Sequence, residues 1–87
     1  MDDKKQKKEI LEREYKKYFE KKVMLEFEIA LQRKLDPNEK SAKKPRQYAS
    51  NGSIMSYDEI TRKEYIEIKE DLLEDINVKL ETIKELL

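Results

Sequence analysis

Two long stretches of the chain place apolar residues at helical spacing. In residues 4–34, one face carries five apolar side chains that Lys22 alone interrupts: Leu11, Tyr15, Tyr18, Leu25 and Ile29. Neither Gly nor Pro occurs in this stretch, and such periodicity without a breaker predicts one long helix. Residues 25–31 also alternate like a strand, so residues 23–31 remain open between helix and strand. The helical pattern continues on both sides of them and favours helix.

The second stretch covers residues 57–87 and follows a heptad series. Its members are separated by steps of three and four: Ile66, Lys69, Leu73, Ile76, Leu80, Ile83 and Leu87. This spacing is typical of a coiled-coil seam. Tyr65, Leu72 and Leu86 widen the apolar face beyond what one neighbouring helix covers. Ser56 and Glu59 have the spacing of a capping box, which predicts a helix start at Tyr57.

Between these stretches the sequence is polar and contains the turn-forming residues. Asp36, Pro37 and Glu39 are an N-cap, a first-turn proline and a capping-box acid, and they predict a short helix over residues 37–44 that Pro45 ends. Residues 45–55 are interpreted as a connector. Asn51-Gly52 favours a type I′ turn within either a small hairpin or an irregular loop. The flanking residues barely alternate, which favours the loop.

These elements predict an all-α fold in a single domain of residues 1–87. The expected architecture is a long helical hairpin with a substantial connector that self-associates into a helical bundle, as a homodimer or larger assembly. The reason is burial, because two helices in one chain leave apolar faces uncovered. The expected self-association surface is the wide face of the last helix: Ile66, Leu72, Leu73, Ile76, Leu80, Ile83 and Leu87.

Composition supports helices with solvated faces. Charged residues make up 46% of the chain and apolar residues 37%, with a net charge of zero. The charge is divided along the chain. Residues 1–34 hold 11 Lys/Arg and 8 Asp/Glu, whereas residues 57–87 hold 5 Lys/Arg and 10 Asp/Glu. Opposite net charges on the two long helices favour their packing against each other.

The residue inventory argues against catalysis. The absence of cysteine excludes disulfides and thiolate chemistry, and the absence of histidine removes the commonest general base and metal ligand. No P-loop, glycine-rich phosphate loop or nucleophile elbow occurs. We therefore expect no enzymatic activity, no cofactor and no bound metal. No apolar run approaches the length of a membrane span, so we expect no membrane association and a cytoplasmic location.

The leading functional prediction is a non-enzymatic protein-binding module, such as a small regulator, inhibitor or assembly factor. Apolar residues nearly encircle the first helix between Val23 and Leu31 and so predict contact with another chain. Arg and Tyr dominate binding hot spots, which points to the connector as a second contact. The predicted partner-binding residues are Met24, Phe27, Leu31, Arg46 and Tyr48.

Two alternatives remain open at this point. A nucleic-acid-binding accessory protein would use two clusters of lysines to contact phosphates: Lys4, Lys5, Lys7 and Lys8, and then Lys43 and Lys44. Their simpler interpretation is a solvated surface whose lysine stems cover apolar neighbours. A structural subunit of a larger assembly is the other alternative.

Overall fold

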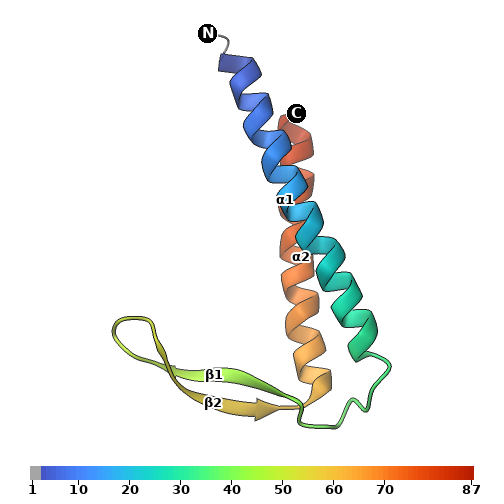
Figure 1. Ribbon diagram of the computed structural model, residues 1–87, viewed down its shortest axis with the longest axis vertical. Helices are drawn as coiled ribbons and strands as arrows, with labels where there is room; N and C mark the ends of the chain where they lie inside the picture. Colours follow the sequence, from blue (N-terminus) through green and yellow to red (C-terminus); the bar gives the residue numbers. More distant parts are fainter. Residues whose placement is uncertain (1–2) are drawn as a thin grey trace.

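The computed structural model describes residues 3–87, which form two helices and a β-hairpin. The order along the chain is α1 (Asp3–Gln32), β1 (Ala42–Tyr48), β2 (Ile54–Ile60) and α2 (Arg62–Leu86). The two helices lie side by side and run in opposite directions, and the hairpin projects sideways from the end where they are joined (Figure 1). The molecule measures 54 × 37 × 15 Å and is therefore thin in one direction.

The prediction of an all-α fold is wrong. The chain adopts an α+β arrangement, because a two-stranded antiparallel sheet stands between the helices in the sequence. The predicted helical bundle and coiled coil are corrected in the same way, since the architecture is not purely helical. The helices themselves occupy the two stretches with helical periodicity, and residues 23–31 are helical rather than extended.

The helices pack along the faces that carry the steps of three and four. Ile76, Leu80 and Ile83 of α2 are buried, as is Ile29 of α1. The α1 face is completed by residues that are half-buried: Leu11, Tyr15, Tyr18, Lys22 and Leu25. Burying one stripe of each helix is the main source of hydrophobic stabilisation available to so small a chain.

Contacts between side chains fix the antiparallel pairing. The Lys79 ammonium lies 5.3 Å from the centre of the Tyr18 ring, and that of Lys84 lies 5.9 Å from the Tyr15 ring. Further along, the Lys69 ammonium is 3.8 Å from a Glu28 carboxylate oxygen. Lysine ammonium groups are attracted to aromatic faces at these distances. These contacts join cations of α2 to rings or a carboxylate of α1, which is the reverse of the net charges of the two helices. Only the ion pair between Arg33, directly after α1, and Glu70 of α2 has the sign that the net charges suggest among the ion pairs described between these segments.

The predicted connector over residues 45–55 and the helix over residues 37–44 are replaced by turns and the β-hairpin. In the antiparallel register Ala42 lies opposite Ile60, Lys43 opposite Glu59, Lys44 opposite Asp58 and Pro45 opposite Tyr57. The register shifts on either side of the Gln47–Ser56 pair, which leaves Arg46 and Met55 bulged. Bulges interrupt the period-two alternation by which a strand is recognised, so these strands escape pattern analysis.

The hairpin turns over residues 49–53. The Gly52 N–H donates to the Ala49 carbonyl at 2.9 Å, and the Ala49 N–H donates to the Ser53 carbonyl at 2.8 Å. Gly52 has a φ of 88°, and it is the only residue with positive φ among those described. The expected type I′ turn would need positive φ at two successive positions. A single left-handed glycine after a tight turn instead matches the common hairpin loop that ends in a glycine bulge.

Local hydrogen bonds explain why no helix forms over residues 37–44. The Asp36 carboxylate accepts from the Asn38 N–H at 2.9 Å, which closes a turn rather than capping a helix. The carbonyls of Pro37 and Glu39 accept from the N–H groups of Lys63 and Arg62, at 3.0 and 2.8 Å. These carbonyls therefore bond to the first turn of α2 and not to a helix of their own.

The start of α2 lies five residues later than predicted, at Arg62. Thr61 is the N-cap, and its hydroxyl accepts from the Glu64 N–H at 3.2 Å. The same hydroxyl lies 3.2 Å from a Glu64 carboxylate oxygen, to which it donates. Ser56 and Glu59 have the same spacing but lie within β2. The sequence thus contains two candidate N-caps, Ser56 and Thr61. Ser56 lies in a strand of the hairpin, so Thr61 caps the helix.

The Arg62 side chain ties the helix ends and the connecting turn together. It is 6% exposed and is the only charged residue in the buried class among those described. Its guanidinium donates to the Gln32 side-chain oxygen at 2.9 Å, the Asp36 carbonyl at 2.6 Å and the Glu39 carboxylate at 2.9 Å. A cation in the first turn of a helix is unfavourable for the helix dipole. These three acceptors offset that cost and the cost of burial.

The exposed surface is large for the mass of the chain. It amounts to 7262 Å² for 10.6 kDa, whereas a compact monomer of this mass exposes about 5,500 Å². The radius of gyration is 17.5 Å, against about 12 Å for a compact chain of this length. The excess reflects a single layer of paired helices and a hairpin that stands apart from it.

Replacing Arg62 with Met should lower the free energy of unfolding by about 2 kcal/mol, because hydrogen bonds from a charged donor are lost at a buried position. Arg62→Lys should not restore stability, since an ammonium cannot reach three divergent acceptors. Urea unfolding followed by circular dichroism measures the effect. Lys63→Met is the control, because Lys63 is exposed, and it should change stability by less than about 0.5 kcal/mol. Equal losses for Arg62→Met and Lys63→Met would contradict this account.

Candidate functional site: an apolar groove between the helices

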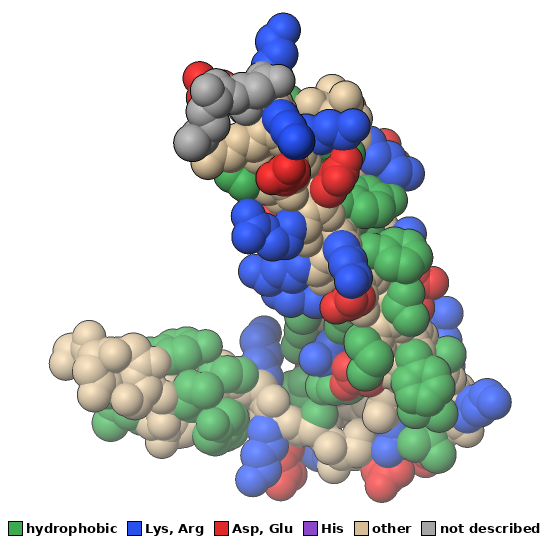
Figure 2. Space-filling model, turned by 45° about the horizontal axis from the view of Figure 1, so that its top comes forward, with side chains coloured by type: hydrophobic (Ala, Val, Ile, Leu, Met, Phe, Trp, Pro, Cys, Tyr) green, Lys and Arg blue, Asp and Glu red, His purple; other side chains and the backbone are tan. Residues whose placement is uncertain are grey.

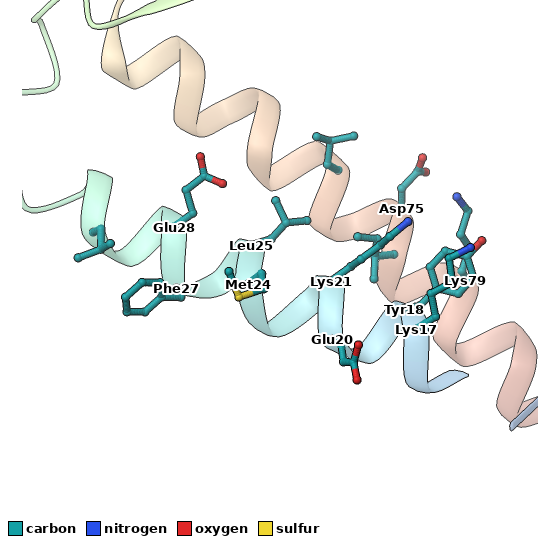
Figure 3. A pocket seen from close by; sticks show the side chains of 13 residues that line it. Lys17, Tyr18, Glu20, Lys21, Met24, Leu25, Phe27, Glu28, Asp75 and Lys79 are labelled. Carbon is teal, nitrogen blue, oxygen red and sulfur yellow. The ribbon is translucent and has the colours of Figure 1, made fainter. Parts of the chain in front are cut away.

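An open groove of about 810 Å³ runs along one side of the helix pair. Its floor is formed by residues of the packed faces, including Tyr18, Leu25 and Ile76. Leu25 reaches toward α2, while Met24 and Phe27 lie along the open side of α1 (Figure 3). Met24 and Phe27 are 66% and 60% exposed, and the groove is completed by Leu31 of α1 and Leu72 of α2. Large apolar side chains thus face solvent over a continuous strip.

Charged side chains of both signs border this strip. Lys17, Lys21 and Lys79 gather around the Tyr18 ring, with ammonium-to-centroid distances of 5.9, 5.5 and 5.3 Å. The carboxylates of Glu20, Glu28 and Asp75 also line the groove. An apolar floor with a rim of mixed charge is the usual anatomy of a protein-binding surface.

The groove has the dimensions of a helix-binding site. On α1 it extends from Lys17 to Leu31, which is about 21 Å at 1.5 Å per residue. A helix of about fourteen residues would match this length. Helix-in-groove recognition buries the apolar face of an amphipathic helix and leaves its charged residues to meet the rim.

Next to the groove, a cluster of polar side chains joins α1 and α2. The Tyr65 hydroxyl of α2 donates to the Glu28 carboxylate of α1, and the Lys69 ammonium is 3.8 Å from the same carboxylate. Burial, followed by the hydrogen bond to Glu28 and the negative charge of Glu28, raises the pKa of Tyr65 to about 12. Tyr65 therefore stays protonated over the physiological range and holds Glu28 in place as a hydrogen-bond donor.

A second apolar surface lies on the hairpin, away from the groove. The exposed side chains are Tyr48, Ile54, Met55 and Tyr57, and hydrophobic groups gather over the middle of the projecting arm (Figure 2). An ion pair between Arg46 and Asp58 joins the two strands at 3.8 Å, with both side chains largely in solvent. Exposed ion pairs contribute little stability, so the hairpin relies mainly on its backbone pairing.

The structure divides the predicted self-association residues between two environments. Ile76, Leu80 and Ile83 are buried, and Ile66 and Leu73 are half-buried, on the α2 face that packs against α1. Leu72 and Leu87 are exposed, and Leu72 lines the groove. Self-association itself remains a prediction.

The predicted partner-binding residues fall on two surfaces. Met24, Phe27 and Leu31 come together in the groove. Arg46 and Tyr48 lie on β1, where both side chains are exposed.

The six lysines of the nucleic-acid alternative are also separated. Lys4, Lys5, Lys7 and Lys8 lie in the first turns of α1, whereas Lys43 and Lys44 lie on β1 at the opposite end of the helix pair (Figure 1). They do not form one continuous patch.

Several residues that shape the site were not singled out for it by sequence reasoning. Tyr18 and Lys79 lie at one end of the groove, and Arg62 and Tyr65 fix the contact between the helices. The spacing of Tyr18 and Lys79 within their helices marks them only as residues near the packed face. Their proximity depends on the antiparallel offset of the helices, for which the sequence gives no direct signal.

No protein-family model, curated protein or solved structure matches this chain, so the surfaces are interpreted from their own chemistry. Within residues 3–87, no group of three or more acidic, histidine or cysteine side chains is arranged to hold a metal ion. The helices of this described part also lack a segment long and apolar enough to cross a membrane.

Tyr65→Phe should remove a pH-dependent contribution to stability. The pKa of Tyr65 rises from 10.0 to about 12 on folding, so the folded state holds this proton more tightly than the unfolded state. The contribution is therefore complete below pH 10 and is lost as the pH rises toward 12. Thermal unfolding of both proteins at several pH values between 9 and 12 should show the wild type losing its advantage. A constant difference across that range would exclude the hydrogen bond from Tyr65 as its source.

Proposed function

We propose that this chain is a non-enzymatic protein-binding module that holds an amphipathic helix of another protein in the groove between α1 and α2. The observation that carries the proposal is the exposure of Met24, Phe27, Leu31 and Leu72 along one continuous strip. An apolar surface of this kind is costly in water unless another surface covers it.

The groove residues suit a binding surface that adapts to its ligand. Methionine is flexible and polarisable, and it packs against irregular apolar surfaces. Phe27 supplies a large rigid face of the kind that dominates binding energy at interfaces. Both side chains are mostly exposed, so each leaves most of its surface available to a ligand.

The rim supports selection by charge. Lys17, Lys21 and Lys79 gather near the Tyr18 end of the groove, where they outnumber the two carboxylates of Glu20 and Asp75 (Figure 3). Glu28 lies toward the Leu31 end and is already paired with Lys69. A bound helix with acidic residues at the Tyr18 end would match this arrangement. Such complementarity mainly sets orientation and partner choice, while the apolar strip supplies the affinity.

Site-specific photo-crosslinking tests the groove. Met24 is replaced by a photo-reactive phenylalanine analogue, and extract from the source cell is irradiated both with and without prior nuclease treatment. A discrete protein adduct is expected. Phe27→Asp should weaken its capture about tenfold or more, because a buried apolar contact is replaced by an unpaired charge.

Val78→Asp is the matched control. Val78 is 59% exposed and Phe27 60%, but Val78 does not line the groove. Circular dichroism should show equal helicity for both variants, and only Phe27→Asp should reduce crosslinking. Equal adducts in both variants would contradict the groove as the binding site. Adducts that disappear with nuclease would instead indicate contact through nucleic acid.

A further inference from the structure

The β-hairpin lacks the packing that normally stabilises strands. Within residues 3–87 its sheet contains two strands only, and they pair with each other. Tyr48, Ile54, Met55 and Tyr57 are all exposed, Met55 to 68%. A two-stranded hairpin without a third strand or a covering helix is marginally stable in water. Another element that joins the sheet would remove this deficit.

The two edges of the hairpin differ in their capacity to accept another strand. β1 contains Lys43, Lys44, Pro45 and the bulged Arg46. Lysine, proline and bulges are the devices by which natural sheets block an edge. β2 contains neither lysine nor proline, and its one bulge, at Met55, lies near its start. The open edge is therefore that of β2.

The Pro45–Tyr57 pair indicates which backbone groups face this open edge. Proline has no N–H, and within a sheet it occurs where that position faces away from the neighbouring strand. Pro45 lies directly opposite Tyr57, so the pair is of the non-hydrogen-bonded type. The N–H and C=O groups of Tyr57 then point outward from β2, where they can bond to an added strand.

We propose that two copies of this chain join antiparallel through β2, with Tyr57 at the two-fold axis, to form the four-stranded sheet β1–β2–β2–β1. Tyr57 is the middle residue of β2 (Ile54–Ile60), so this register aligns the full lengths of the two strands, with each Met55 bulge away from the axis. It also sets the two Tyr57 rings side by side, a favourable cross-strand pair.

Charge fits this register. Asp58 lies opposite the partner's Ser56, and Glu59 lies opposite the partner's Met55, so no carboxylate faces another. Centring the pair on Asp58 or Glu59 would oppose like charges directly. Within each hairpin, Lys43 and Lys44 already stand opposite Glu59 and Asp58. Two hairpins therefore approach each other with little net repulsion.

The proposed assembly is closed and has room for its interface. Each β1 becomes an outer edge, where Pro45 and three basic residues oppose further growth. Each chain exposes 7262 Å², about 1,800 Å² more than a compact monomer of its mass. A standard interface takes about 800 Å² from each partner.

No groove residue lies on the hairpin, so the dimer would present two grooves and could bind a bivalent partner.

A single cysteine tests the two-fold axis, because the natural chain has none. In Tyr57→Cys, the paired Cα atoms would be about 5.5 Å apart, within the range that a disulfide spans. Oxidation should give a reducible species of twice 10.6 kDa. Tyr48→Cys is the control, because Tyr48 is at least as accessible, with 61% of its surface exposed against 52% for Tyr57, but lies on β1. Equal crosslinking of the two variants, or none at position 57, would overturn the proposal.

Light scattering at micromolar concentration provides the second measurement. The wild type should have the mass of two chains. Tyr57→Pro should have the mass of one with unchanged helicity, because it removes the outward N–H and the ring at the two-fold axis but no bond between β1 and β2. Lys43→Pro makes the corresponding change on the edge of β1 and should remain a dimer. A wild-type mass of one chain, a dimeric Tyr57→Pro, or an open-ended series of masses would each refute the closed β2-to-β2 dimer.

Discussion

The buried guanidinium of Arg62 is the interaction on which the arrangement of this chain depends. It connects the last turn of α1, the turn over residues 36–39 and the first turn of α2, through Gln32, the Asp36 carbonyl and Glu39. The hairpin ends at Ile60, two residues before it. One side chain thus sets both where the helices come together and where the hairpin leaves them. The groove and the open edge of β2 take their positions from this junction.

The helices could be predicted from the sequence because their signals are local and repeated. Long stretches without Gly or Pro and steps of three and four identify α1 and α2, and the same pattern indicates the residues that are buried, such as Ile76 and Leu80. The cluster of Met24, Phe27 and Leu31 was also recognisable, because apolar residues outside the packed face are unusual on a helix. Leu72 was placed on a different surface, since its distance from α1 depends on how the helices are offset.

The hairpin could not be predicted in the same way, because its determinants are weak or distant. Bulges at Arg46 and Met55 break the alternation of both strands, and Asn51-Gly52 was the only clear local sign. The competing prediction of a helix over residues 37–44 relied on Asp36 and Glu39 as capping residues. In the fold, Glu39 accepts a hydrogen bond from Arg62, 23 residues later. A side chain claimed by a distant partner is not available for the local motif that its spacing suggests.

The hairpin also shortens the loop that must close before the two helices can pack against each other. Residues 33–61 separate the two helices, and closing so long a flexible loop is entropically costly. Pairing of Ala42 with Ile60 removes most of that loop and leaves residues 33–41 as the effective connection. Hairpins form within about 1–10 μs, and in each molecule whose hairpin is formed when the helices dock, the shorter connection lowers the entropic cost of docking by about 1 kcal/mol. An element that lies outside the hydrophobic contact between the helices thereby influences how fast that contact forms.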